Sequence, residues 1–392
     1  MDEERARQLK SVYRRGLLDD TLPFWVDHAV DREHGGFLFC LDRNGTVIDT
    51  DKGMWQHGRF VWLLSTLYTT VEKRQQWLDL ARHGIEFLRE HGFDEDGRMY
   101  FTVTRTGEPI RQRRYVFTEL FATMALAAYA DAAGDERAAQ EARDLFRLVV
   151  KHLTTPGLLP PKYNPDVRPM KSMAVPMTLL VTAQVLRDTV DAPFSEEWID
   201  RCIDEIREDF LDPERKAVLE TVGPNGEFLD HFDGRLLNPG HAIEGAWFIL
   251  REAHRRDADE ALLELGTTML DWMWERGWDD EHGGILYFRD VKGLPVQEYW
   301  HDMKFWWPQN EAIIATLLAY ALTGDETYAT WHRKAHDWAY EHFPDPEFGE
   351  WYGYLHRDGR LSARTKGNVW KGPFHLPRMQ LYGWQMIDEL LL

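Results

Sequence analysis

The sequence contains few of the features that mark a secreted, disulfide-bonded or membrane-spanning protein. Its 392 residues include only two cysteines, Cys40 and Cys202, and no CxxC pair. Such a chain has no disulfide framework and no zinc signature, and it suits a reducing compartment. No apolar run approaches the roughly 18 residues that a membrane span needs, and the charged N-terminus lacks the apolar core of a signal peptide. We therefore expect a cytoplasmic protein without a transmembrane helix.

Positive charge and cofactor motifs are also scarce. The chain has 46 basic and 66 acidic residues, which gives a net charge of −20. No basic stripe is present to neutralise phosphates, so we expect no nucleic-acid partner and no anionic membrane surface as a partner. The phosphate-binding patterns GxxxxGK[ST] and GxGxxG are missing, as is GxSxG in a usable context. The chemistry must therefore come from His, Glu, Arg and aromatic side chains, and we expect no cofactor.

What the chain does contain is a repeated turn. Six similar segments start 57 to 67 residues apart and run from one end of the sequence to the other. A period of about 60 residues indicates a repeated supersecondary unit, and six units can close into a ring with a central ligand site. The segments begin with Asp31-Arg-Glu-His-Gly-Gly, Asp94-Glu-Asp-Gly, Thr155-Pro-Gly, Asp212-Pro-Glu, Asp279-Asp-Glu-His-Gly-Gly and Asp345-Pro-Glu-Phe-Gly.

Between these turns the apolar residues recur at spacings of three and four, which predicts two helices per repeat. Twelve helices in six pairs indicate an all-α (α/α)6 barrel, and the continuous repeats predict one domain over residues 1–392. The alternating pattern around Asn44-Gly45 predicts short β-hairpins at one end of the barrel. The expected helices cover about 4–22, 55–72, 75–92, 115–133, 136–152, 171–189, 196–210, 240–256, 258–276, 306–323, 325–342 and 374–390.

The second helix of each pair has polar side chains in its first turn and small apolar ones after it. This pattern suits an inner ring whose polar ends converge on one mouth of the barrel. The chain also has 17 Trp, 14 Tyr and 20 Phe, and aromatic rings of this kind can stack on sugars. The first turns include Trp55-Gln-His-Gly-Arg59, Arg114-Tyr115-Val-Phe-Thr-Glu119, Lys171-Ser-Met173, His241-Ala-Ile-Glu244, Trp306-Trp307-Pro-Gln-Asn-Glu311 and Phe374-His375.

Each candidate residue also has an ordinary structural explanation. His241 and Glu244 share a helix face at i, i+3, but they follow an Asn-Pro-Gly cap. A metal could use this pair, yet no second His/Glu pair is evident, so we expect no metal ion. His375 lies between two prolines, Arg59 could form an ion pair with a loop acid, and Glu311 could simply complement a helix dipole. Lys162, in a Pro-rich loop, could be solvated.

Taken together, these strings resemble the N-acylglucosamine 2-epimerase (renin-binding protein) family. The similar segments are Gly35-Gly-Phe, Cys40-Leu-Asp-Arg-Asn-Gly, Met54-Trp-Gln-His-Gly-Arg-Phe-Val-Trp62, Ser172-Met-Ala-Val-Pro-Met177, Asn238-Pro-Gly-His-Ala-Ile-Glu-Gly-Ala-Trp247, Trp307-Pro-Gln-Asn-Glu-Ala312 and Lys371-Gly-Pro-Phe-His-Leu-Pro-Arg378. The resemblance implies an (α/α)6 barrel that epimerises sugars at C2, or interconverts aldose and ketose, without a redox cofactor.

The resemblance also implies roles for individual residues. The catalytic set would be Arg59, His241, Glu244, Glu311 and His375, with both histidines exchanging the proton at C2. The expected sugar contacts are Lys162, Tyr115, Glu119, Met173, Trp306, Trp307 and Trp370. Family members that are cellobiose 2-epimerases or mannose isomerases typically place a histidine on the sixth helix, where this chain has Met173.

The main hypothesis is therefore a 2-epimerase for N-acetylglucosamine and N-acetylmannosamine. An aldose–ketose isomerase of the mannose type and a cellobiose-type 2-epimerase remain alternatives. A glycoside hydrolase would need two carboxylates at the right separation and would leave the histidines idle, and a non-catalytic sugar-binding barrel would not need them. The expected partner is a small carbohydrate, and a homodimer is left open.

Overall fold

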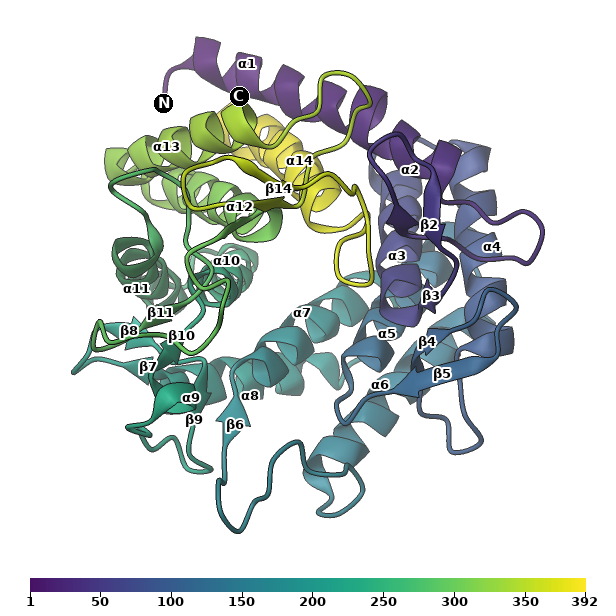
Figure 1. Cartoon of the computed structure of the whole chain (residues 1–392), viewed down its shortest axis with the longest axis horizontal. Coiled ribbons are helices and arrows are strands. Elements are labelled where there is room, and N and C mark those ends of the chain that lie inside the picture. The colour runs from purple at the N-terminus through teal and green to yellow at the C-terminus, as the bar shows by residue number, and fades with distance from the viewer.

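The computed structural model describes residues 1–392 and shows two concentric rings of helices (Figure 1). Inner and outer helices alternate along the chain, so each repeat supplies one of each. The inner ring consists of α3 (Met54–Thr70), α5 (Phe117–Ala133), α7 (Ala174–Thr189), α10 (Pro239–Arg255), α12 (Trp306–Thr323) and α14 (His375–Met386). The outer ring consists of α1 (Glu3–Arg15), α4 (Gln75–His91), α6 (Glu136–Thr154), α8 (Ser195–Glu205), α11 (Glu260–Gly277) and α13 (Glu326–His342).

The apolar pattern of each helix explains its ring. α5 is buried continuously from Thr118 to Ala130, because its small and apolar residues surround the whole helix. Outer helices such as α6 bury only one stripe and expose charged residues on the other side. A helix that is apolar all round must be covered by others, whereas an amphipathic one can face water. The predicted (α/α)6 arrangement, with the second helix of each pair inside, is therefore confirmed.

The ends of several helices follow the predicted caps. Gly134 and Gly324 end α5 and α12 with φ values of 66° and 71°. The next residues, Asp135 and Asp325, begin α6 and α13 by accepting backbone N–H bonds with their side chains. Three helices continue through a wider π-helical turn, at Gly16–Thr21, Ile206–Phe210 and Ile387–Leu391, and two short helices, α2 (Leu22–His28) and α9 (Phe232–Arg235), lie between the long ones.

Short antiparallel strands lie at one end of the barrel, as predicted. Strands β3, β6, β10 and β12 run directly or almost directly into inner helices, so the strands lie at the N-terminal ends of the inner ring. The pairs are β1–β2, β3–β4–β5, β6–β9, β7–β8, β10–β11 and β12–β13–β14. Their bounds are β1 (Cys40–Leu41), β2 (Val47–Asp49), β3 (Lys52–Gly53), β4 (Tyr100–Val103), β5 (Pro109–Gln112), β6 (Lys171–Ser172), β7 (Leu211–Asp212), β8 (Ala217–Val218), β9 (Thr221–Val222), β10 (Leu236–Leu237), β11 (Arg289–Asp290), β12 (Lys304–Phe305), β13 (Tyr354–Leu355) and β14 (Leu361–Ala363).

One hydrophobic core holds both rings together. It contains 100 buried apolar residues, from Ala6 in the first helix to Ile387 in the last. The two chain ends lie close together at the rim of the ring (Figure 1). None of the helices combines the length and the apolar character required to cross a membrane.

Candidate active site

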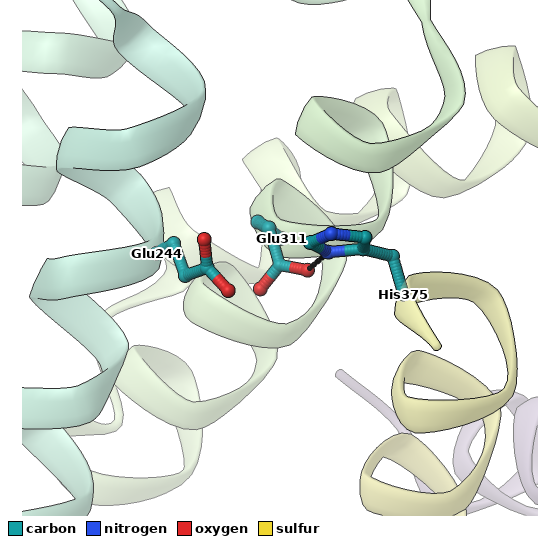
Figure 2. A group of neighbouring side chains, drawn as sticks. All are labelled: Glu244, Glu311 and His375. Atoms are coloured by element: carbon teal, nitrogen blue, oxygen red, sulfur yellow. Dashed lines mark hydrogen bonds and ion pairs between the residues drawn. The ribbon is translucent and has the colours of Figure 1, made fainter. Parts of the chain in front are cut away.

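Three inner helices bring acidic and basic side chains together at the strand-bearing end. Glu244 from α10, Glu311 from α12 and His375 from α14 face one another (Figure 2), and one ligand atom from each lies within 4.8 Å of the others. All three residues are buried. Nδ1 of His375 lies 2.7 Å from Oε1 of Glu311. The cluster therefore joins positions up to 131 residues apart in the chain.

A fourth member of this cluster, Arg378, was missed by the sequence reasoning. It lies one turn after His375 on the same face of α14, and its guanidinium donates to Oε1 of Glu311 over 2.7 Å and to Oε1 of Glu244. The side chain is 2% exposed and lies over the Phe374 ring at 4.5 Å. Two carboxylates and a histidine could ligate a metal ion, but here the guanidinium already lies against both carboxylates. A bound cation would have to displace it.

Glu311 has partners for both of its oxygens. Oε1 accepts from His375 and Arg378, and Oε2 accepts from Nε1 of Trp247 over 2.7 Å. A fully buried carboxylate is tolerated only when it is paired and hydrogen-bonded, and this one is. Glu311 therefore orients the imidazole and has no free oxygen for a ligand.

The electrostatic surroundings keep His375 neutral. Burial holds the pKa of His375 well below its usual range, and the positive charges of Arg378 and Arg59 act in the same direction against the carboxylate of Glu244. In the neutral ring, Nδ1–H donates to Glu311. Nε2 is then left with a lone pair and no protein partner, which is the state that a general base requires.

Arg59, from the first turns of α3, carries a charge that no carboxylate neutralises directly. Its guanidinium lies 4.1 to 4.6 Å from the rings of Trp55, Phe121 and Phe374, and its Nε has no hydrogen-bond partner. Burial lowers the pKa of Arg59 to about 9, and the charge of Glu244 partly opposes this. A buried cation without a paired anion can bind an anion, or an oxygen that becomes anionic during a reaction.

His241, from the first turn of α10, and His375 both lie close to the Trp307 ring. The ring of Trp307 is 5.2 Å from that of His241 and 5.6 Å from that of His375. Nδ1 of His241 lies 3.1 Å from Oε2 of Glu220, a residue that no sequence pattern indicated. Burial lowers the pKa of His241, but the charge and hydrogen bond of Glu220, together with the charges of Glu244 and Glu311, outweigh it and the net shift is upward. The two histidines are thus at one end of the barrel with opposite shifts.

Four of the predicted sugar contacts lie around this cluster. Trp306 is buried and edge-on to His375 at 6.1 Å, and Trp307 lies near both histidines. Trp370 is 46% exposed and lies edge-on to Trp55 at 5.5 Å. Met173 is buried at the start of α7.

Three other predicted contacts are not joined to the cluster. Glu119 is fully buried and accepts from Nε of Arg98 and from the backbone N–H of Met99. Oε1 of this carboxylate therefore holds the segment before β4 against α5, and the contact of Glu119 with a sugar stays a prediction. Tyr115 is half-buried and packs on Phe117 at 4.9 Å. Lys162 lies exposed on the loop between α6 and β6, with its ammonium 5.6 Å from the neighbouring Tyr163 ring.

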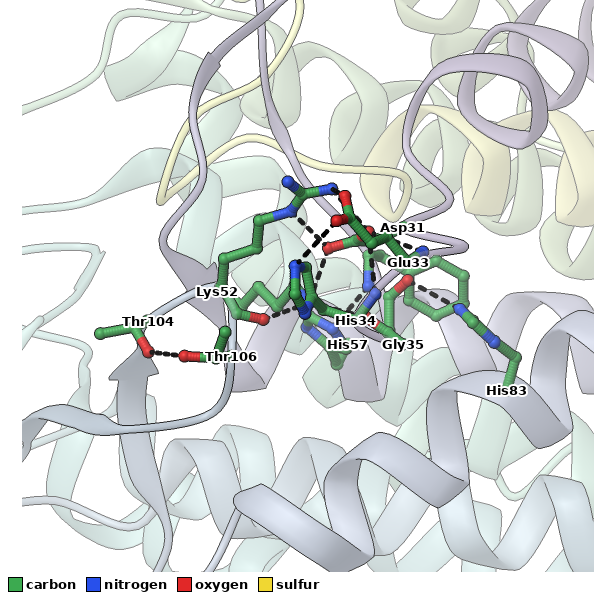
Figure 3. A network of polar contacts seen from close by, with 12 residues as sticks. Asp31, Glu33, His34, Gly35, Lys52, His57, His83, Thr104 and Thr106 are labelled. Carbon is green, nitrogen blue, oxygen red and sulfur yellow. Dashed lines mark hydrogen bonds and ion pairs between the residues drawn. The ribbon is translucent and has the colours of Figure 1, made fainter.

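A repeated ion cluster positions the start of the inner helices (Figure 3). Lys52, just before α3, lies 3.0 Å from the Asp31 carboxylate and donates to the carbonyl of Gly35, while Arg105 at a hairpin tip also donates to Asp31. His57 completes the attachment by accepting the backbone N–H of Phe37 through Nε2. The turn is thereby fixed to the helix that carries Arg59.

The same arrangement occurs twice more. Lys304 and Arg357 contact Asp279 before α12. Lys366 and Arg43 contact Asp345, which connects the sixth repeat to the first and closes the ring. These clusters hold the mouth of the barrel on the side that carries Arg59, Glu311 and His375.

Comparison with known proteins gives consistent similarities. The family described as N-acylglucosamine 2-epimerase (GlcNAc 2-epimerase) matches residues 35–375. The chain is 37% identical over 398 residues to the N-acylglucosamine 2-epimerase of Bos taurus, covering 100% of this chain and 94% of that one. It is 24% identical to the cellobiose 2-epimerase of Bacteroides fragilis, over 95% of this chain and 97% of that one. The fold is similar to that of the cellobiose 2-epimerase from Bacillus thermoamylovorans B4167, with a TM-score of 0.86 at 23% identity over 97% of this chain and 99% of the other.

Proposed function

The chain belongs to the N-acylglucosamine 2-epimerase family, and on this premise we propose that it interconverts N-acetylglucosamine and N-acetylmannosamine by moving the proton at C2. The relatives that carry the N-acylglucosamine name are 34 to 37% identical to it over essentially the whole chain. Those named cellobiose 2-epimerase are 24 to 25% identical. The greater identity supports an N-acylated monosaccharide over a disaccharide.

The reaction sets the requirements for the site. The hydrogen at C2 is acidic only when C1 is a free carbonyl, so the pyranose must open first. Removal of the C2 proton then gives an enolate across C1 and C2, with the negative charge on O1 and the acetamido group still on C2, and a proton returns to the opposite face. Two groups that titrate near neutrality, one on each face, meet this requirement, and histidine is the side chain with a suitable ordinary pKa.

The single observation that carries the proposal is the pair of histidines beside Trp307, each with its own carboxylate. His375 donates Nδ1–H to Glu311 and His241 contacts Glu220, so both rings present Nε2 as the free nitrogen. The upward pKa shift of His241 and the downward shift of His375 favour an imidazolium beside a neutral imidazole. In this resting state His375 removes a proton and His241 supplies one. Turnover in the opposite direction uses the opposite protonation of the pair.

The remaining groups support the charge and the sugar. The guanidinium of Arg59 stabilises the oxyanion that develops at O1, since a preorganised buried cation is effective in a site with little water. Oε1 of Glu244 accepts a hydrogen bond from Arg378, whereas Oε2 has no protein partner. Oε2 can therefore accept a hydrogen bond from a sugar hydroxyl. Trp307 and Trp370 offer ring faces or edges to the apolar side of the sugar, and Met173, Tyr115, Trp306 and Lys162 complete the proposed contacts.

Both cysteines are free, which supports the further proposal that the enzyme works in the cytoplasm on a diffusible carbohydrate. The excess of acidic residues supports the absence of a nucleic-acid partner.

Product analysis tests the proposed function. Purified protein is incubated separately with N-acetylglucosamine, N-acetylmannosamine, mannose and cellobiose, and the products are separated by chromatography. We expect the 2-epimer from the two N-acetyl sugars. The variants H241N and H375N should each lose at least about 10²-fold in turnover, the lower range for a lost general acid–base. The control H34N, on a loop histidine outside the site, should keep full turnover. Ketose as the main product would replace the epimerase assignment with an aldose–ketose isomerase, and no turnover of any sugar would reject both.

A further inference from the structure

We propose that Glu220 is the positioning residue of His241: its carboxylate fixes the tautomer and orientation of the imidazole so that Nε2 faces the sugar. This inference deepens the proposed function and rests on it for its catalytic meaning. The contact itself is independent of any substrate.

Backbone pairing of the short strands fixes the position of Glu220. The residue lies between β8 and β9, and β9 pairs with β6 in the register Ser172 to Thr221. The carbonyl of Glu220 accepts the backbone N–H of Met173 over 3.1 Å, so the same residue is tied to the start of α7. Its carboxylate oxygens lie 3.2 and 3.1 Å from Nδ1 of His241. The pairing of β6 with β9 therefore holds the Glu220 carboxylate against His241, which lies 21 residues further along the chain.

Asn238 and Glu220 both contact Nδ1 of His241, and they favour different tautomers of the ring. Its Oδ1 accepts the backbone N–H of His241 as the cap of α10, which turns its amide NH2 toward Nδ1 of the ring at 3.1 Å. An amide NH2 favours a lone pair on Nδ1, whereas a carboxylate favours a proton there. The two contacts cannot both be satisfied at Nδ1 by one tautomer. The ionised carboxylate wins, because a lone pair facing a carboxylate is repulsive and a charge-assisted hydrogen bond is the stronger of the two.

Other charged groups near the ring do not substitute for this contact. Glu244 from α10 and Glu311 from α12 act on His241 only through space. His375 faces it from α14, and Tyr287 lies near Glu220. Among all of these, only Glu220 touches a ring nitrogen of His241. Removal of its charge should therefore change the titration of His241 and leave that of His375 in place.

The test uses E220Q in the full chain, with E220D as the conservative variant and E227Q as the matched control. Glu227 lies seven residues further on in the same strand region, is bonded to Asn225 and does not contact His241. With histidine labelled at Cε1, the His241 resonance is assigned by its loss in H241N and is then titrated by NMR. An opposite charge in contact typically shifts a pKa by about 1 to 3 units. The substitution E220Q should therefore lower the pKa of His241 by about 1 unit or more. E220D should keep most of the shift, and E227Q should keep all of it.

Kinetics give the second readout. In the pH profile of kcat/KM, the alkaline limb should move to a pH about 1 unit lower in E220Q. The value of kcat/KM should then fall about tenfold at pH 8 and recover toward pH 6. The equilibrium constant fixes the ratio of kcat/KM in the two directions, so the loss must be equal for both epimers. KM should change little, because Glu220 does not face the sugar.

The outcomes separate the two hypotheses. A His241 titration and a kinetic limb that are unchanged in E220Q would overturn the role of Glu220 while leaving the epimerase assignment intact. An inactive wild type whose His241 still responds to E220Q would reject the proposed function and keep the positioning contact. If E220Q does not fold, the wild-type titration decides, because a His241 that titrates below its ordinary value of about 6.5 contradicts the proposal.

Discussion

Replacing Arg378 with methionine tests how the acidic cluster is stabilised. The side chain is of similar length, so the change removes the guanidinium and little volume. Glu244 and Glu311 would then be left buried, with exposed side-chain fractions of 8% and 0%, and without the cation that now lies against both. Breaking a buried ion pair on one side typically costs about 3–5 kcal/mol, because the remaining charge has no compensation.

The expected change in melting temperature follows from the size of the protein. With about 2.1 cal/mol/K of unfolding entropy per residue, a chain of this length has about 0.8 kcal/mol/K. A loss of about 3–5 kcal/mol therefore lowers Tm by about 4–6 °C. The loss should also depend on pH. In the variant, protonation of a buried carboxylate or of His375 offsets the uncompensated negative charge. The destabilisation is therefore smaller at low pH and grows as the pH rises.

Thermal unfolding by circular dichroism at pH 5.5 and pH 8, repeated at several scan rates, measures this effect. The deficit of R378M should be larger at pH 8. The control R251M removes an arginine that is one-third exposed and paired with Asp188 at the surface. Exposed pairs contribute about 0–1 kcal/mol, so its Tm should fall by about 1 °C or less. A deficit in R378M that is no larger than that of R251M, or that does not grow with pH, would refute the reasoning.

Two further changes test the mouth of the barrel. D345N removes the carboxylate that joins Arg43 and Lys366 across the ring closure. The charges and hydrogen bonds of Arg43 and Lys366 hold the pKa of Asp345 below its usual range against the opposing effect of burial. Its stabilisation is therefore present above the unfolded pKa and is lost as the pH falls through the folded pKa. Acid titration of unfolding should show a full Tm deficit at pH 7 that shrinks progressively below about pH 4. Gly36 has a φ of 63°, and the Cβ that G36A adds would lie 2.5 Å from Nε2 of His57. Melting curves should show a loss of about 1–3 kcal/mol, and an unchanged Tm would mean that this turn relaxes freely.

The sequence predicted the helices well because each boundary has a local cause. The expected helix 306–323 matches α12, which is bounded by β12 and by the left-handed Gly324. The first expected helix ended too early, at residue 22. The helical chain continues to His28, because Pro23 occupies the first turn of α2, where a missing N–H costs nothing, and a wide π-helical turn at Gly16–Thr21 joins α1 to α2.

The site was harder to predict where its contacts are long-range. Arg378 had a local signal, since it shares a helix face with His375 at i, i+3. Glu220 had none, because it lies in irregular chain and reaches His241 only through the pairing of β6 with β9, which joins segments about 50 residues apart. The partner of Glu119 was also hidden from the sequence, because Arg98, which binds its carboxylate, lies in a neighbouring turn 21 residues earlier in the chain.

The position of deuterium in the product tests the central claim most directly. N-acetylmannosamine and N-acetylglucosamine are each incubated with the enzyme in D2O, and the products are analysed by NMR at C1 and C2. Two-histidine epimerisation predicts the 2-epimer with solvent deuterium at C2 and none at C1. Product that retains the original C2 hydrogen would contradict proton exchange at this carbon and with it the two-histidine account.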